Sequence, residues 1–173
     1  MKVWFLPVLL SGLAAAAVSG CTTDGGSGQP SFYASMADAS ATVDAAAAAS
    51  MISGYRGNNG LGAVAVDPEL MRMAMDQARV MAAKDKLDHS AGRDFNSRLA
   101  SSGFDAKVAV ENVGAGYHTL AEAFSGWRDS PSHRANMLKG GVNRMGIAAV
   151  YAPQSKYKVF WALIMAAKDE GRG

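Results

Sequence analysis

MGIAAVY at residues 145–151 and YKVFWALIM at residues 157–165 are the two apolar runs that decide the fold of this chain. Both are rich in β-branched and aromatic residues, and residues 152–156 separate them. This composition and spacing predict a β-hairpin. A third strand is expected over residues 108–110, leading into Glu111. Because helical patterns precede these strands, we expect an α+β domain with an antiparallel sheet.

The clearest helix is predicted from Asp67-Pro68 to about Lys86, because an acceptor side chain followed by proline is typical of a helix start. An alanine-rich helix is expected before it, over residues 37–55. His89 should then lie just beyond the end of the clearest helix. The helix that starts at Asp67-Pro68 has an apolar face, formed by residues at three- and four-residue spacing, which we interpret as core: Leu70, Met73, Ala74, Gln77, Ala78 and Met81.

Two further helix starts lie closer to the strands. Thr119 and Glu122 have the spacing of a capping box, which predicts a helix over residues 120–127. Ser130-Pro131 predicts a short third helix with Ser130 as its cap. In that helix His133 and Asn136 are one turn apart, so their side chains are expected to lie side by side.

The N-terminus has the pattern of an export signal. Lys2 precedes an apolar run over residues 3–17, and the small residues 18–20 lead to Cys21. The run is shorter than the ~20 apolar residues that a spanning helix needs. Its ending resembles a bacterial lipobox, in which the cysteine is acylated and becomes the new N-terminus. The alternative is an ordinary secretory peptide with an incidental cysteine.

These patterns predict the organisation of the whole chain. We expect a lipoprotein signal peptide over residues 1–20, a flexible Gly- and Ser-rich tether with lipidated Cys21 over residues 21–36, a folded domain over residues 37–168 and a tail over residues 169–173. The membrane, reached through the lipid anchor, is therefore one predicted partner. Since Cys21 is the sole cysteine, the domain is expected to fold without a disulfide.

Charge and the residue after Cys21 bear on partner and location. Seventeen Lys and Arg against fifteen Asp and Glu give a net charge of +2, without a basic stripe, which argues against nucleic acid as the partner. Thr22 follows the cysteine where an acidic residue would signal retention at the inner membrane. We therefore expect the outer membrane rather than the inner one, with the domain facing the periplasm or the exterior.

Two histidines and a glutamate are the candidate chemical groups of the domain: His89, Glu111 and His133. Two His and one Glu with an open fourth position are what a catalytic zinc site uses. Structural hydrogen bonding between the same side chains is the competing interpretation. Nucleophilic catalysis is not expected, because the chain has no Gly-x-Ser-x-Gly elbow and Ser130 is assigned to a helix cap.

Five segments carry a family resemblance. In chain order they are residues 70–87 with His89, Glu111-Asn112, Trp127, residues 130–138 and residues 145–147. In this order, and over roughly residues 45–166, the chain resembles the CAP superfamily of cysteine-rich secretory proteins, antigen 5 and plant pathogenesis-related proteins. The similarity is to its bacterial, SCP-like extracellular branch.

The resemblance implies a three-layer α–β–α sandwich with a central antiparallel sheet and a surface cleft. Many members line that cleft with two His and two Glu, and some bind a divalent cation there. By position, His89, Glu111 and His133 would line the cleft, supported by Asn112, Ser130 and Asn136. Ser130 stands where many eukaryotic relatives carry the second glutamate, so a complete four-residue metal site is not expected.

Three functions remain as hypotheses. The first is a non-enzymatic binding module on a bacterial envelope, which uses the cleft for a small apolar ligand, a peptide or a glycan. The second is a metal-assisted hydrolase in which His89 and His133 bind zinc and Glu111 is a ligand or general base. The third is a structural envelope protein in which the same residues tie helices to the sheet. No pattern indicates the oligomeric state.

Overall fold

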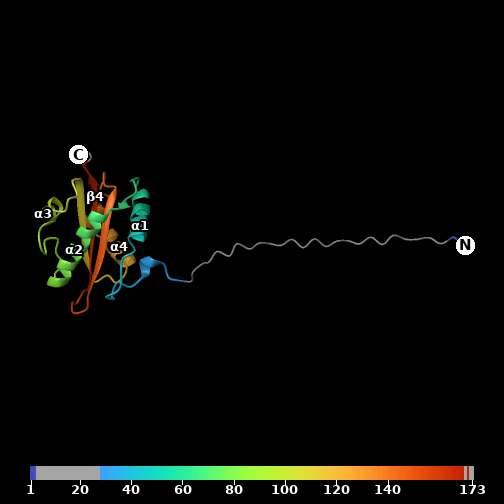
Figure 1. The fold of residues 1–173 in the computed structure, drawn as a ribbon, viewed down its shortest axis with the longest axis horizontal. Coiled ribbons are helices and arrows are strands. Elements are labelled where there is room, and N and C mark those ends of the chain that lie inside the picture. The colour runs from blue at the N-terminus through green and yellow to red at the C-terminus, as the bar shows by residue number, and fades with distance from the viewer. Residues whose placement is uncertain (3–27, 170, 172–173) are drawn as a thin grey trace.

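The computed structural model describes residues 1–2, 28–169 and 171, and Cys21 with most of the N-terminal signal therefore lies outside the described residues. Helices cover both faces of one sheet (Figure 1). Among the described residues, no helix combines the length and apolar character needed to cross a bilayer. The elements, in chain order, are η1 (Ser31–Tyr33), α1 (Ala45–Gly57), β1 (Ala65–Val66), α2 (Pro68–Lys84), α3 (Phe95–Ala100), β2 (Ala106–Ala115), α4 (Leu120–Asp129), α5 (Pro131–Met137), β3 (Arg144–Ala152) and β4 (Lys158–Lys168).

The sheet has the strand order β1-β3-β4-β2. β3 and β4 form the predicted antiparallel hairpin, with Val150 opposite Phe160 and Ala152 opposite Lys158. β2 pairs antiparallel with the other side of β4, so the third predicted strand is confirmed and lies at the edge of the sheet. β1 was not predicted. It has two residues and pairs parallel with β3, and a segment that short shows no alternation of apolar and polar residues.

β4 is the central strand and is apolar on both sides, because each of its faces meets a separate core. Successive side chains of a strand point to opposite faces of the sheet. Residues of β4 accordingly alternate between the two hydrophobic clusters. Val159, Trp161, Leu163 and Met165 belong to one cluster, and Phe160, Ala162, Ile164 and Ala166 belong to the other.

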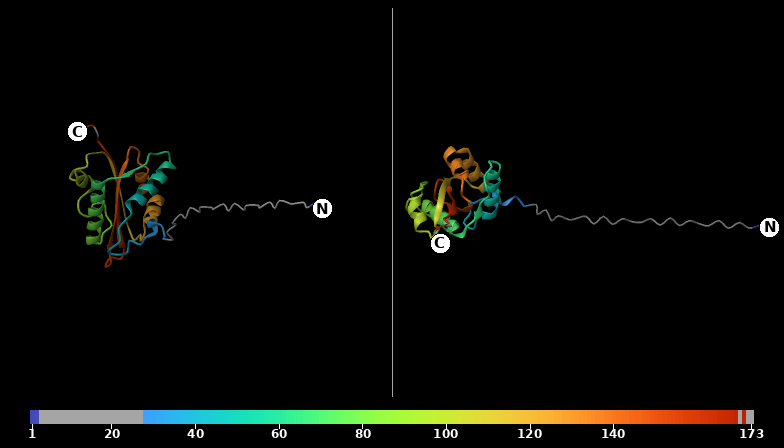
Figure 2. Two further views of the ribbon diagram at one scale, coloured as in Figure 1. Left: turned by 45° about the vertical axis from the view of Figure 1, so that its right-hand side comes forward. Right: turned by 90° about the horizontal axis from the view of Figure 1, so that it is seen from above.

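The two cores correspond to two helical layers (Figure 2). α2, joined at the side by α3, packs on one face, and the predicted apolar face of α2 is buried in full. α1, α4 and α5 cover the other face, where Ile52, Trp127 and Met137 are buried. The structure is therefore an α–β–α sandwich, as expected, and only the short β1 departs from an antiparallel sheet.

α2 sits unusually close to the sheet, and its two ends are well defined. Asp67 accepts hydrogen bonds from the backbone of Glu69 and Leu70, which confirms the predicted start. The helix ends at Lys84, two residues before the predicted end, because Asp85 takes a left-handed conformation with φ 46°. A Cβ atom at Gly146 of β3 would lie 2.0 Å from the backbone of Leu70, so this position requires glycine.

The N-terminal part of the domain differs from the prediction. The helix begins at Ala45 rather than near residue 37, because the Asp44 side chain accepts a hydrogen bond from Ala47 and so caps the helix there. Residues 31–36, which we expected in the tether, lie against the domain. Met36 is buried, and its backbone N–H donates to the carbonyl of His118. Burial of Met36 ties this segment to the domain.

Arg56 joins α1 to the loop after α5. Its side chain is almost completely buried and donates to the backbone carbonyls of Gly62, Met137, Lys139 and Val142. Burial lowers the pKa of this guanidinium from its ordinary value. Four carbonyl acceptors replace the water that burial removes, so Arg56 holds the end of α5 and the loop after it in place.

Candidate functional site

The candidate site is built around two consecutive residues of β2, Glu111 and Asn112. We predicted that Glu111 would follow a strand, but β2 continues through it to Ala115, and Glu111 lies opposite Ile164 of β4. Because neighbouring side chains of a strand point to opposite faces, Glu111 points toward the α2–α3 layer and Asn112 points toward α5. β2 is an edge strand, so segments from both layers reach these two residues.

Glu111 is a buried carboxylate with two basic partners. Its side chain is only 2% exposed. Arg98 Nη2 donates to both of its oxygens, at 2.9 Å to Oε1 and 2.7 Å to Oε2. His89 Nδ1 lies 2.9 Å from Oε1. A buried carboxylate is tolerated only with such compensation, so these two partners account for its stability inside the protein.

Arg98 is the residue of this site that the sequence analysis missed. It lies on α3, a short helix that was not predicted, whose start is capped by Asp94 accepting from the backbone of Ser97. That cap is a signal from which the helix could have been found. The pairing of Arg98 with Glu111 had no local signal, because the two residues are 13 positions apart and belong to different elements.

His89 lies beyond the end of α2, as predicted, and its backbone is held from two sides. Gln77 Nε2 donates to the carbonyls of Asp88 and His89, and Arg98 Nη2 also donates to the His89 carbonyl. The ring is about half exposed, at 51%. Its hydrogen bond with Glu111 raises the pKa of His89 above the ordinary 6.5. The imidazolium form is therefore favoured by the carboxylate beside it.

Asn112 and Asn136 form a neutral network on the other side of β2. Asn136 Nδ2 donates to Asn112 Oδ1 and to the backbone carbonyl of Glu111, each at 2.9 Å. Asn112 Nδ2 donates to the carbonyl of His133, also at 2.9 Å. His133 thus enters the network through its backbone. Burial lowers the pKa of its imidazole, and the positive charge of His89 lowers it further.

Ser130 lies at the start of α5, as predicted, but does not cap it with its side chain. Its hydroxyl oxygen lies 3.4 Å from that of Ser132 instead. Asp129, the neighbouring carboxylate, pairs with Arg128 at 2.8 Å on the exposed surface. The capping box before α4 also differs in detail. Thr119 accepts from Glu122 as predicted, whereas the Glu122 carboxylate accepts from the backbone of His118.

A divalent cation does not fit this arrangement. Within the described part of the chain, no three His, Cys, Asp or Glu side chains are grouped so that they could hold a metal ion. The chemistry of Glu111 gives the physical reason. Both of its oxygens already accept from the Arg98 guanidinium, and a metal ion bound there would lie beside that positive charge.

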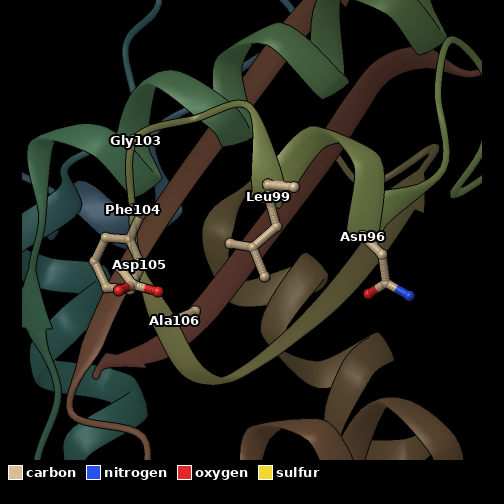
Figure 3. A pocket seen from close by; sticks show the side chains of 7 residues that line it. Asn96, Leu99, Gly103, Phe104, Asp105 and Ala106 are labelled. Carbon is tan, nitrogen blue, oxygen red and sulfur yellow. The ribbon is translucent and has the colours of Figure 1, made fainter. Parts of the chain in front are cut away.

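A hollow of about 430 Å³ lies beside α3 and is lined by residues of α3 and of the segment after it (Figure 3). Leu99, Ala100, Phe104 and Ala106 form its apolar part, and Asn96 and Asp105 contribute polar groups. Its volume lies within the range of small-molecule sites, about 300–1,000 Å³. The same short helix therefore carries Arg98 toward Glu111 and Leu99 toward a cavity.

Comparison with known proteins identifies the family. A model of the CAP family, the cysteine-rich secretory proteins, matches residues 49–165, which is more than half of the chain. The chain belongs to the CAP family. Among curated proteins, it is 30% identical over 98 residues to YkwD of Bacillus subtilis, which is described as uncharacterized. That match covers 55% of this chain and 38% of YkwD.

Solved structures agree with the fold of this CAP domain. An extracellular protein of Bacillus anthracis that contains an SCP domain matches with a TM-score of 0.62 and 20% identity, over 71% of this chain and 40% of that one. An outer surface protein of Borrelia burgdorferi matches with a TM-score of 0.64 and 16% identity, over 74% of this chain and 98% of that one. This CAP domain thus corresponds to less than half of YkwD and of the Bacillus anthracis protein.

Proposed function

We propose that this CAP domain is an exported, lipid-anchored binding module of a bacterial envelope, and that it binds a small ligand with an apolar part. The observation that carries the proposal is that the Glu111 carboxylate is buried and paired with two basic side chains. A general base must reach the proton that it removes, whereas this carboxylate is buried and held by Arg98 and His89. The group best suited to catalysis by residue type is thus engaged in holding the structure.

The amide side chains that support the site are engaged in a similar way, whereas His133 takes part through its backbone carbonyl. Asn112 and Asn136 bond to each other and to backbone carbonyls. The Ser130 hydroxyl lies near that of Ser132, and within the described part of the chain it makes no hydrogen bond to a histidine that could activate it. These contacts favour binding over the hydrolase hypothesis, because that hypothesis needs Glu111 as a ligand or general base and this carboxylate is already held by Arg98 and His89.

The hollow beside α3 supports the choice of ligand. Its lining combines the aliphatic side chain of Leu99 and the ring of Phe104 with polar groups at Asn96 and Asp105. Small-molecule sites are typically concave and mainly apolar, with a few polar groups that orient the ligand. A ligand with both apolar and polar parts matches this lining, in which the two kinds of surface are about equal.

The ligand can be sought directly. We expect protein purified under native conditions to release a small apolar compound on organic extraction, detected by mass spectrometry. Leu99→Arg, which places a charged side chain in the hollow, should abolish the compound. Ala46→Arg adds the same side chain at an exposed position of α1 and should leave it unchanged. Equal amounts of the compound in both variants would contradict binding in this hollow.

Export and anchoring rest on the N-terminal pattern of Lys2, the apolar run and Cys21. Covalent lipid contributes about 0.8 kcal/mol of membrane affinity per buried methylene, so two or more acyl chains would hold the protein firmly. Cells fed a labelled fatty acid should label the native chain, which should be recovered with membranes. Cys21→Ala should lose the label. Continued labelling of that variant would refute the lipoprotein assignment.

A further inference from the structure

Arg98 contacts both oxygens of the buried Glu111 carboxylate and the backbone of His89. Its side chain is 13% exposed, and its Nη2 lies within hydrogen-bond distance of both Glu111 oxygens. The same nitrogen donates to the His89 carbonyl at 3.1 Å. Its Nε donates to the carbonyl of Arg93, also at 3.1 Å. Two of the three guanidinium nitrogens, Nη2 and Nε, are therefore held by groups of this chain.

We infer that Arg98 takes the place of a metal ion in this CAP domain: it neutralises Glu111, positions His89 and keeps divalent cations out of the site. This role of Arg98 holds whichever ligand the domain binds. Arg98 is a positioning residue, since its contacts are to other side chains and backbone of the site.

The geometry supports both parts of the assignment. A carboxylate offers about four lone-pair positions, and three are used by two contacts from Arg98 and one from His89. A cation on the remaining position would be repelled by the adjacent guanidinium. Arg98 also holds His89 at two points, directly at its carbonyl and indirectly through the Glu111 oxygen that contacts its ring. Loss of Arg98 would release both.

Arginine suits this task because of its shape and its constant charge. The planar guanidinium carries five N–H donors and stays protonated at every physiological pH. A metal ion would be lost when its ligands are protonated or when a chelator competes for it. A guanidinium that belongs to the chain is not lost under either condition, so the site is assembled without an ion from solution.

The first test needs no variant. Zinc is titrated into the purified full chain while the imidazole signals of His89 are followed by two-dimensional ¹H–¹⁵N NMR. We expect no saturable change at His89 and no rise in Tm with zinc or fall with a chelator. A saturable zinc-dependent shift at His89 that Glu111→Gln abolishes would overturn the inference, because it would place the metal at the site assigned to Arg98.

The second test replaces the cation. Arg98→Met should lower Tm by roughly 10 °C, the effect expected when a buried pair loses one member in a domain of this size. The double variant Arg98→Met/Glu111→Gln removes both charges and should recover most of that loss. Arg98→Lys retains the charge, so its Tm should lie between those of the native protein and Arg98→Met.

The third readout separates positioning from general stability. In the native protein the His89 Nδ1 proton should give one hydrogen-bonded signal, because Nδ1 lies against the Glu111 carboxylate. Arg98→Lys should retain this signal, and Arg98→Met, or the double variant if Arg98→Met does not fold, should lose it. A native-like His89 signal in a folded variant without Arg98 would contradict the positioning role. An unchanged Tm in Arg98→Met would contradict neutralisation of Glu111.

Discussion

Glu111 and Asn112 are neighbours in β2, but their side chains are held by different kinds of contact. The charged half of the site consists of His89, Arg98 and Glu111, and its contacts are ion pairs around a buried carboxylate. The amide half consists of Asn112 and Asn136 with the His133 carbonyl, and its contacts are neutral hydrogen bonds. One strand thus joins the α2–α3 layer by charge and α5 by amides.

This difference determines how much stability the protein loses when a residue of each half is substituted. Leaving a buried charge without its partner lowers the free energy of unfolding by the full desolvation penalty of that charge. The corresponding loss for a neutral amide is smaller. The two halves also differ in their response to pH. In the charged half, Glu111 raises the pKa of the His89 imidazole. The amides do not titrate, and beside them burial lowers the pKa of the His133 imidazole.

The largest effect is expected from Glu111→Gln. The variant keeps the shape of the side chain but leaves the Arg98 guanidinium without its buried anion, so the free energy of unfolding should fall by about 3–5 kcal/mol. Urea denaturation followed by circular dichroism measures it. Glu122→Gln is a matched control at an exposed position. If both variants unfold at the same urea concentration, the charged half does not have the role assigned to it.

Asn136→Ala should have an intermediate effect. It removes the donor to Asn112 Oδ1 and to the Glu111 carbonyl, and one or two acceptors left without partners cost about 1–3 kcal/mol. The same denaturation experiment applies, with the exposed Ala135→Gly in α5 as a measure of helix propensity alone. A loss as large as that of Glu111→Gln would remove the distinction between the halves.

Substitution of either histidine should change the stability only slightly, and the two changes should depend on pH in opposite directions. The pKa of His89 is raised in the folded protein by its hydrogen bond to Glu111. Its stabilisation is therefore fully present below the unfolded-state pKa of about 6.5 and is lost as the pH rises through the higher folded value. His89→Gln should accordingly cost more stability near about pH 5 than near about pH 9, by less than ~1 kcal/mol because the ring is half exposed.

His133 provides the comparison for that experiment. Burial lowers its pKa, with a further contribution from the positive charge of His89, so the imidazole opposes folding increasingly as the pH falls below about 6.5. His133→Gln should thus gain stability relative to native protein on acidification. NMR titration of both rings checks the order of their pKa values. An identical pH dependence of the two variants would contradict the separate environments assigned to them.

The smallest effect is expected from Ser130→Ala. Ser130 occupies the N-cap position of α5 without a side-chain cap, so the change in unfolding free energy should stay within about 0.5 kcal/mol. Thr119→Ala removes a cap that does accept from Glu122 and should cost about 1 kcal/mol. Thermal melting of the two variants together shows whether α5 needs a capping hydroxyl. A loss at Ser130 equal to that at Thr119 would show that it does.

Much of the fold could be predicted because its signals are local. Asp67-Pro68 marked the start of α2, and the spacing of Leu70, Met73 and their neighbours marked its buried face. The runs that form β3 and β4 marked the hairpin. The N-terminal limit was wrong, since the pattern of residues 31–36 resembled a tether while Met36 is buried against the domain. Alanine content placed the start of α1 too early, where Asp44 provides the actual cap.

The residues of the site were partly predictable for a different reason. His89, Glu111 and His133 could be named because few groups in this chain offer such chemistry and the resemblance placed them in order. Their partners could not be named. Arg98 is one of many basic residues, and nothing near it in the sequence sets it apart from the others. The absence of a side-chain cap at Ser130 likewise depends on how α5 packs.

The sequence alone determined the periodicity of α2, the hairpin of β3 and β4, the membership of the α+β class and the position of the candidate groups along the chain. These follow from contacts between residues close in sequence and from the alternation of apolar and polar side chains. Only the tertiary structure decided that Glu111 is buried against Arg98 and His89, while Asn112 faces α5. That outcome depends on where separate elements meet at the edge of the sheet, and the electrostatic cost of burying a carboxylate makes the meeting with Arg98 specific.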